Sequence, residues 1–211
     1  GSGSNERRTR KNKRTSAKRS LMKPLGKLIV FSAPSGSGKT TIVRELLKDP
    51  ALNLSFSISA TSRASRGQEQ NGVDYLFLTP EDFKHRAEQG AFLEWEEVYP
   101  DHFYGTVKAH VQHLREQGIN VLFDVDVKGG IAIKNVYPED TLAIFVMPPS
   151  IEELKRRLES RGTESLEKIE MRMAKAVQEM TLAQFFDQCL VNNELTQAVG
   201  QAKALILNHT E

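Results

Sequence analysis

A glycine-containing segment near the start of the sequence has the residue types that bind phosphate. Residues 32–41 read Ser-Ala-Pro-Ser-Gly-Ser-Gly-Lys-Thr-Thr and follow an apolar run, residues 28–31. Small residues let successive backbone N–H groups surround a phosphate, and a following helix adds the positive end of its dipole. Lys39 could contact the outer phosphates of a nucleotide, and the Thr40 hydroxyl could ligate Mg²⁺. The segment therefore predicts a phosphate-binding loop (P-loop) between a strand and a helix.

One position of this segment departs from the usual P-loop pattern. Ala33 stands where the first glycine of G-x-x-x-x-G-K-[ST] is expected, so we expect an ordinary backbone conformation there, whereas Gly36 and Gly38 keep their freedom. The alternative is a plain strand–turn–helix junction that happens to read Ser-Gly-Lys-Thr. The apolar strand before it and the amphipathic segment 42–47 after it favour the P-loop.

Carboxylates and arginines elsewhere in the sequence could complete a phosphoryl-transfer site. Asp124 and Asp126 end the apolar run 119–126, which is typical of a Walker-B strand that delivers a carboxylate beside Mg²⁺. Arg63 and Arg66 lie three residues apart in a polar segment, where guanidinium groups can bind an anion. The alternative for the two arginines is a solvated basic turn.

The composition limits the kinds of protein that this chain could be. At 211 residues, 39% hydrophobic and 27% charged, the sequence is typical of a globular domain, and it contains no apolar run of membrane-spanning length. The one cysteine, Cys189, excludes an intrachain disulfide and favours a reducing compartment such as the cytoplasm. The five histidines show no metal-binding spacing.

Basic residues are concentrated at the N-terminal end. Residues 1–21 hold eight basic residues and one acid, Glu6, whereas the whole sequence has a formal net charge of only +2. The rest of the sequence is therefore acidic, and nucleic-acid affinity is not expected of the fold. We expect residues 1–21 to be a disordered basic tail, of which residues 1–4 look vector-derived. An arm attracted to RNA or membranes is an alternative; a mitochondrial presequence would need amphipathic spacing that is missing.

Apolar periodicity indicates strands that alternate with helices along most of the chain. Strands are expected at 28–31, 55–59, 73–78, 91–98, 119–126, 142–146 and 188–192. Helices are expected at 42–47, 81–89, 107–117, 127–136, from 151, at 165–180 and at 195–207. This alternation predicts an α/β fold with a parallel sheet and helices on both faces. The interval 57–98 is richer in strands and is expected to form an inserted lobe.

The ordered set of motifs resembles the guanylate kinases of the nucleoside-monophosphate kinase superfamily, over residues 26–208. The motifs that carry the resemblance are 32–39, 59–66, 71–75, 92–95, 104–106, 122–126, 157–163 and 191–192. Around residues 99–103, between Glu94 and Tyr104, the spacing is one residue longer than the common form. The resemblance implies a domain over 22–208, with a P-loop core at 26–56 and 99–208, a GMP-binding lobe at 57–98 and a lid at about 157–172.

The resemblance also implies roles for individual residues. A carboxylate can accept two hydrogen bonds from guanine, which suits Glu94 with Asp126 as a second acceptor, while Ser59 and Thr106 offer hydroxyls to the base. The residues expected to hold the GMP phosphate are Arg63, Arg66, Tyr75 and Tyr104. Those expected to bind ATP are Ala33, Pro34, Ser35, Gly36, Ser37, Gly38, Lys39, Thr40, Thr41 and Asn192. Thr40 and Asp124 are expected to hold Mg²⁺, partly through water. The catalytic residues are expected to be Lys39, Arg63, Arg157, Arg161 and Arg172.

The implied activity is Mg²⁺-dependent transfer of the γ-phosphoryl group of ATP to GMP, giving ADP and GDP, within purine nucleotide metabolism. ATP and GMP are the expected partners, with dGMP as a further acceptor, no specific nucleic acid, no membrane, and a monomer or homo-oligomer in the cytoplasm. Two alternatives stay open: another P-loop kinase or NTPase, and a non-catalytic scaffold module that binds phosphorylated partners. The presence of Lys39, Thr40 and Asp124 favours the enzyme.

Overall fold

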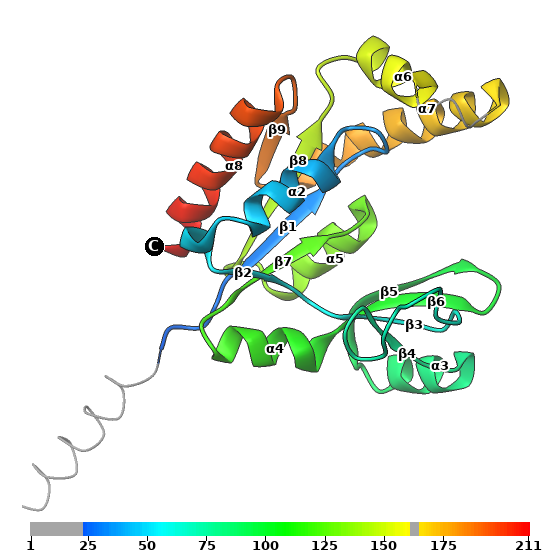
Figure 1. Cartoon of the computed structure of the whole chain (residues 1–211), viewed down its shortest axis with the longest axis vertical. Coiled ribbons are helices and arrows are strands. Elements are labelled where there is room, and N and C mark those ends of the chain that lie inside the picture. The colour runs from blue at the N-terminus through cyan, green and yellow to red at the C-terminus, as the bar shows by residue number, and fades with distance from the viewer. Residues whose placement is uncertain (1–22, 161–164) are drawn as a thin grey trace, which may run out of the picture.

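The strands form two separate sheets (Figure 1). A computed structural model describes residues 23–160 and 165–211. Within them, one sheet has five parallel strands in the order β2-β7-β1-β8-β9, and the other has four strands in the order β4-β3-β6-β5. The expected tail at 1–21 and the expected catalytic Arg161 lie outside the described residues. The α/β fold with a parallel core sheet is confirmed.

The five-stranded sheet is covered by helices on both faces. Its strands are β1 (Leu28–Ser32), β2 (Leu54–Phe56), β7 (Asn120–Asp124), β8 (Thr141–Met147) and β9 (Gln188–Val191). Every residue of β1 is buried, as expected for a central parallel strand whose two faces are both covered.

Alternate side chains of β1 point to the two helical layers. Ile29 and Phe31 pack with α2 (Lys39–Leu47) and α8 (Leu195–Thr210). Val30, which lies between them in the strand, packs on the opposite face. That face is covered by the helices α4 (Lys108–Glu116) and α5 (Val127–Val136) and by the short helix η2 (Leu182–Phe185). A second short helix, η1 (Pro50–Leu52), joins α2 to β2. Within the described residues, no helix combines the length and apolar composition needed to cross a membrane.

The four-stranded sheet has its own small core. Its strands are β3 (Ser59–Thr61), β4 (Tyr75–Phe77), β5 (Phe92–Tyr99) and β6 (His102–Val107). Helix α3 (Pro80–Glu88) covers one face through Phe83, whose ring stacks on Phe92 at 4.4 Å and on Phe103 at 5.2 Å between centroids. This separate aromatic cluster allows the sheet to be stable as a lobe.

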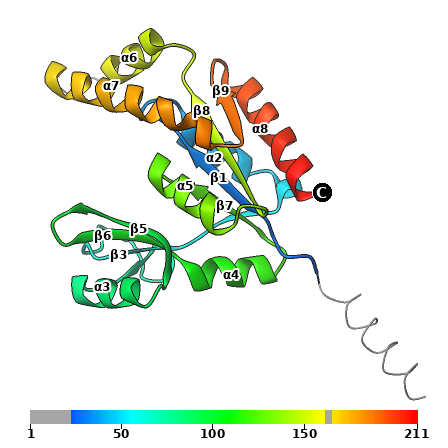
Figure 2. The same cartoon turned by 180° about the vertical axis from the view of Figure 1, so that it is seen from behind.

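Two further helices form a third unit, α6 (Ile151–Ser160) and α7 (Leu166–Thr181). They pack together through Leu154, Leu158 and Ile169. In both views the four-stranded sheet and the α6–α7 pair lie on either side of the carboxyl end of β1 (Figures 1 and 2). The P-loop therefore emerges between them.

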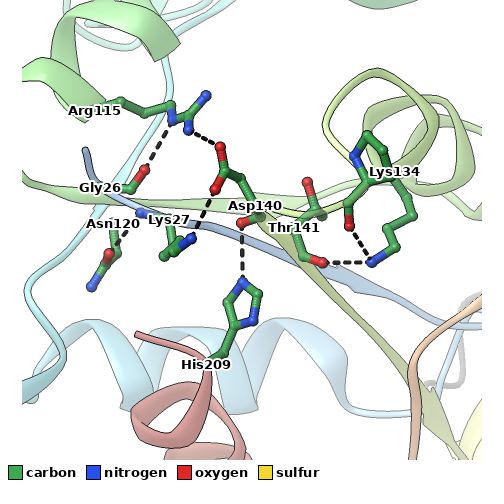
Figure 3. Close-up of polar contacts among 9 residues, drawn as sticks. Gly26, Lys27, Arg115, Asn120, Lys134, Asp140, Thr141 and His209 are labelled. Carbon is green, nitrogen blue, oxygen red and sulfur yellow. Dashed lines mark hydrogen bonds and ion pairs between the residues drawn. The ribbon is translucent and has the colours of Figure 1, made fainter. Parts of the chain in front are cut away.

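A polar network closes the opposite, amino end of the parallel sheet (Figure 3). The buried Arg115 donates to the Gly26 carbonyl at 2.9 Å and pairs with Asp140. Lys27 pairs with the same carboxylate at 2.8 Å, and the Asp140 carbonyl lies 3.0 Å from Nε2 of His209. The network thereby joins the start of β1, α4, the turn before β8 and the end of α8.

Two expectations about the strands are wrong. The single strand expected at 55–59 is two strands in different sheets, because Ser55 pairs with Val121 of β7 and Ser59 pairs with Thr106 of β6. The lobe end expected at residue 98 falls inside β5, and β6 stays in the same sheet to Val107. Alternation of apolar residues reports a strand but not its partner, so neither feature could be inferred from the pattern.

Candidate active site

The segment 33–41 forms a tight loop and the start of α2. Gly36 and Gly38 have φ of 90° and 83°, in the left-handed region that glycine adopts at little cost, whereas Ala33 lies in the core without a positive φ. A Cβ on Gly38 would lie 2.3 Å from Nδ2 of Asn192, which donates to the Ser37 carbonyl at 2.9 Å. The ordinary backbone expected at Ala33 is confirmed, and Asn192 braces the loop.

The loop contacts the end of β7 through its lysine and threonine. Nζ of Lys39 lies 2.6 Å from Oδ1 of Asp124 and donates to the Val125 carbonyl at 2.9 Å. The Thr40 hydroxyl donates to Oδ2 of Asp124 at 3.2 Å. The three residues expected around the phosphates and the metal are thus brought together from two elements.

A cavity of about 400 Å³ lies over this loop. Residues 33–41 and 124–126 line it on one side, and α7 contributes Arg172, Lys175 and Glu179 on the other. These three residues of α7 lie three and four positions apart, so they share one face of the helix. Sequence reasoning predicted Arg172 but neither Lys175 nor Glu179, which this spacing could have indicated.

A second cavity of about 390 Å³ opens on the four-stranded sheet. Of the residues expected to bind GMP, the ones that line it are Ser59, Tyr75, Glu94, Tyr104 and Asp126. Glu96 and Val98 of β5 line it as well, although the sequence did not single them out. Residues 124–126 line both cavities, so the two spaces meet at the end of β7.

The carboxylate of Glu94 lies at the inner wall of the second cavity. Its Oε1 accepts a hydrogen bond from the Thr106 hydroxyl. Burial raises the pKa of Glu94; the Thr106 bond opposes this shift, and the nearby Asp126 and Glu96 carboxylates add to it. Asp126 itself caps α5 by accepting from the Gly129 N–H at 2.8 Å. Asp126 therefore begins helix α5, whereas the sequence analysis placed it at the end of the strand 119–126.

Glycines in the first turn of α5 allow this close arrangement. A Cβ on Gly129 would lie 2.8 Å from Oδ1 of Asp126 and 3.3 Å from Oε2 of Glu94. A Cβ on the following Gly130 would lie 2.5 Å from the Ser32 hydroxyl. These two glycines, which lie near the start of the helix predicted at 127–136, thus let α5 approach both β1 and Glu94.

Two residues expected at the GMP phosphate, Tyr75 and Tyr104, contact a third, Arg63. Its guanidinium is buried, donates to the Tyr104 hydroxyl at 3.2 Å and lies 5.0 Å from the ring centroid of Tyr75. It also makes a bidentate pair with Glu69, at 2.7 and 2.8 Å. Hydrogen bonds from Arg63 and from the Arg66 N–H lower the pKa of Glu69 to about 2. The side chain of Arg66 is exposed and does not line the cavity.

Glu69 is a partner of the expected site residue Arg63 that the sequence analysis missed. It lies between Arg66 and Tyr75, inside the segment that was expected to bind the anion. Its carboxylate takes up the forked donor pair of Arg63 that would suit phosphate oxygens. An acid three residues after an arginine in a polar loop was the available signal.

The arginines of the α6–α7 unit divide between two sides of the P-loop. Arg172 lines the first cavity. Arg157 donates to Glu153 at 2.9 Å and to the Asn192 carbonyl at 3.2 Å, and it lines a further cavity beside Gly36 and Gly38. The two arginines thus line different cavities beside the loop, while Arg161 lies outside the described residues.

Comparison with known proteins identifies relatives along nearly the whole chain. The family model described as guanylate kinase matches residues 25–209. A guanylate kinase of Bacteroides thetaiotaomicron is 56% identical over 187 residues, covering 89% of this chain and 91% of that protein. A guanylate kinase of Porphyromonas gingivalis is 53% identical over 180 residues, covering 85% and 96%.

A solved structure agrees with these sequence matches. The crystal structure of guanylate kinase from Anaplasma phagocytophilum superposes with a TM-score of 0.67 at 27% identity, covering 90% of this chain and 88% of that one. Its fold and the matched family therefore agree with the P-loop core and second sheet described above. The chain belongs to the guanylate kinase family.

Proposed function

We propose that ATP occupies the cavity over the P-loop and GMP the cavity on the four-stranded sheet. As a guanylate kinase, the chain is an enzyme that transfers the γ-phosphoryl group of ATP to GMP. The observation that carries the proposal is that residues 124–126 line both cavities. A donor phosphate in one cavity and an acceptor phosphate in the other would meet at these residues.

The P-loop would hold the triphosphate through its backbone N–H groups and through Lys39. Lys39 now pairs with Asp124, so binding of ATP would exchange this carboxylate for phosphate oxygens. Arg157 and Asn192 line a further cavity beside the loop that shares no residue with the second cavity, which suits the adenosine side of the nucleotide. The residues proposed to line the ATP site remain Ala33 to Thr41 and Asn192.

Thr40 and Asp124 fit a magnesium ion. Their hydroxyl and carboxylate oxygens lie 3.2 Å apart, and oxygen is the ligand that Mg²⁺ prefers. Among the described residues, no group of three or more acidic, histidine or cysteine side chains could hold a metal, which suits an ion bound mainly through phosphates and water. When bound, the ion would neutralise charge on the β- and γ-phosphates.

The second cavity would recognise guanine through carboxylates. Glu94 would accept from the N1–H and the exocyclic amino group of guanine, with Asp126 as a second acceptor. Ser59 and Thr106 face each other across β3 and β6, so both hydroxyls lie beside this position. Adenine lacks this donor edge, and it would leave the buried Glu94 unpaired.

The acceptor phosphate would lie against Arg63, Tyr75 and Tyr104. These groups already contact one another, so the site needs only the displacement or sharing of the Glu69 carboxylate. Arg66 would join through a change of its exposed side chain.

The transfer itself needs positioning and positive charge. An oxygen of the GMP phosphate attacks the γ-phosphorus of ATP, the bond to the bridging oxygen breaks, and ADP leaves. Lys39 and Arg172 line the first cavity, Arg63 belongs to the proposed acceptor-phosphate site, and cations there would stabilise charge on the transferring phosphoryl group. Arg157 and Arg161 complete the proposed catalytic set. The use of dGMP, the monomeric or homo-oligomeric state and the cytoplasmic location stay predictions.

The test is an acceptor panel in which ADP formation is measured with GMP, dGMP, AMP, CMP and UMP. We expect kcat/KM for GMP to exceed that for AMP by at least about a thousandfold, because a site built on hydrogen bonds rejects an analogue without the matching groups. Glu94→Gln should remove most of this preference. Retention of the full preference by Glu94→Gln would contradict the assignment of the second cavity.

A further inference from the structure

Glu96 on β5 faces the reaction cleft but has no role in the scheme above. Side chains alternate along a strand, and Glu94, Glu96 and Val98 all line the second cavity. Trp95, between them, packs on the other face against Phe83 of α3. Glu96 therefore projects into the same space as the guanine-reading carboxylate.

Lys175 on α7 faces the cleft from the opposite wall. It lines the first cavity together with Arg172 and Glu179, on one face of the helix. Its Nζ lies 3.7 Å from Oε1 of Glu179, and the side chain is 73% exposed. A pair of this length and exposure is weak, so Lys175 can exchange this partner at little cost.

The electrostatic surroundings bring these two residues into relation. Among the described residues, no hydrogen bond or ion pair engages the Glu96 carboxylate, and burial and the Asp126 carboxylate raise its pKa. Lys175 and, more weakly, Lys128 of α5 oppose that shift, so the Lys175 ammonium lies within electrostatic reach of Glu96. Because burial and the Asp126 carboxylate disfavour the charge on Glu96, a pair with a cation from the facing helix would stabilise that charge.

We propose that Glu96 and Lys175 form an ion pair across the cleft when both nucleotides are bound, and that this pair positions Arg172 over the reacting phosphates. The inference rests on the proposed placement of ATP and GMP. Lys175 lies three residues after Arg172 on the same helix face, so fixing one fixes the other. Glu96 belongs to the lobe proposed to bind GMP and Lys175 to the helix beside ATP, so the pair couples the two sites.

The coupling can be measured without turnover. Calorimetry gives the affinity for GMP with and without a non-hydrolysable ATP analogue, and the ratio of the two is the coupling between sites. We expect Glu96→Gln and Lys175→Gln each to reduce this ratio by about two- to fivefold, the range of a partly exposed ion pair. Lys175→Gln should leave the affinity for GMP alone unchanged, because Lys175 does not line the second cavity.

Kinetics of single and double variants test the pair itself. Each single variant should lower kcat by about two- to fivefold, and Glu96→Gln/Lys175→Gln should lower it no further than one single variant. The charge exchange Glu96→Lys/Lys175→Glu should recover part of the lost coupling. Glu97→Gln is the matched control, because Glu97 accepts from the Asp101 N–H in the hairpin and does not line the cavity, and its amide oxygen can still accept.

Three results would overturn the pair. Multiplicative losses in the double variant would show that Glu96 and Lys175 act independently, for example with Lys175 binding phosphate directly. Unchanged coupling in both single variants would exclude the pair. Loss of coupling in Lys128→Gln, with none in Lys175→Gln, would give Glu96 a different partner. Glu94→Gln separates these results from failure of the proposed function, because retention of the full preference for GMP by Glu94→Gln would contradict the proposed GMP site itself.

Discussion

The two ends of the parallel sheet use similar charged residues in opposite ways. At the amino end, Asp140 accepts from Lys27 and Arg115, and these bonds lower its pKa despite partial burial (Figure 3). At the carboxyl end, burial and neighbouring carboxylates raise the pKa of Glu94 and Glu96. One end is therefore a set of satisfied pairs, whereas the other holds, beside the Lys39–Asp124 pair, two carboxylates, Glu94 and Glu96, whose ionisation burial disfavours.

This difference separates carboxylates whose ionisation stabilises the fold from carboxylates whose ionisation opposes folding. A depressed acid pKa means that ionisation favours the folded state, and a raised one means that ionisation opposes it. Carboxylates are kept at the carboxyl end although their ionisation there costs stability, which is common at functional sites. The comparison teaches that charge alone does not mark the active site, because similar carboxylates are paired with cations at one end and disfavoured by burial at the other.

The strongest way to sharpen this contrast is to remove Glu94. Glu94→Ala should lower kcat/KM for GMP by about 10⁴-fold, because the base loses its paired acceptor. The affinity for an ATP analogue should stay nearly the same, since Glu94 does not line the first cavity. Steady-state kinetics with calorimetry of the analogue check both points, and unchanged kcat/KM would remove Glu94 from the site.

The matching change at the other end is Arg115→Ala. It removes a buried cation from Asp140 and the Gly26 carbonyl and should lower the free energy of unfolding by about 3 kcal/mol. The low end of the usual range applies because Asp140 is partly exposed and keeps Lys27. Urea unfolding and kcat on the same samples test the contrast. A large fall in kcat under conditions where the variant is folded would break it.

A smaller effect is expected from the arginine that faces the first cavity. Arg172→Ala should lower kcat by about a hundredfold and ATP affinity much less, because a cation near the transferring phosphoryl group acts mainly on the transition state. Arg172→Lys should recover only part, since lysine lacks the planar fork. Equal losses in kcat and in ATP affinity would instead indicate ground-state binding.

The smallest effect is a difference in pH dependence. The folded pKa of Asp140 lies below its usual 3.8, so its contribution to stability is complete above that value and is lost as pH falls through the folded pKa. The folded pKa of Glu94 lies above its usual 4.5, so Glu94 becomes protonated earlier as pH falls. GMP recognition should therefore begin to weaken at a pH above the one at which an ordinary glutamate would lose its charge.

Acidification should therefore weaken GMP binding before it removes the stabilisation that Asp140 provides. Calorimetry of GMP and thermal unfolding across the acidic range test this order. Glu94→Gln is the control. Its GMP binding should lack the acid-induced weakening, whereas its thermal stability should depend on pH as it does in the wild-type chain. Simultaneous loss of binding and of stability in the wild-type chain would contradict the separation of the two ends.

Much of the site could be predicted from short stretches of sequence. The P-loop, the aspartate at the end of β7 and the helix 127–136 depend on residue types and spacings within about ten positions, where local conformation decides the outcome. Glu94, Tyr75 and Tyr104 could be proposed because their motifs resemble a known family, and the structure gathers all three at one cavity.

Other features depended on partners far apart in the chain. Residues 55–59 have one alternating pattern, but their pairing partners divide them between two sheets. Arg115 reaches a carbonyl 89 residues away, and Lys39 reaches Asp124 from a separate element. Local sequence determined which helices, strands and phosphate-binding groups form. Only the tertiary structure decided which charges are paired and which face the cleft, because that depends on how distant elements pack.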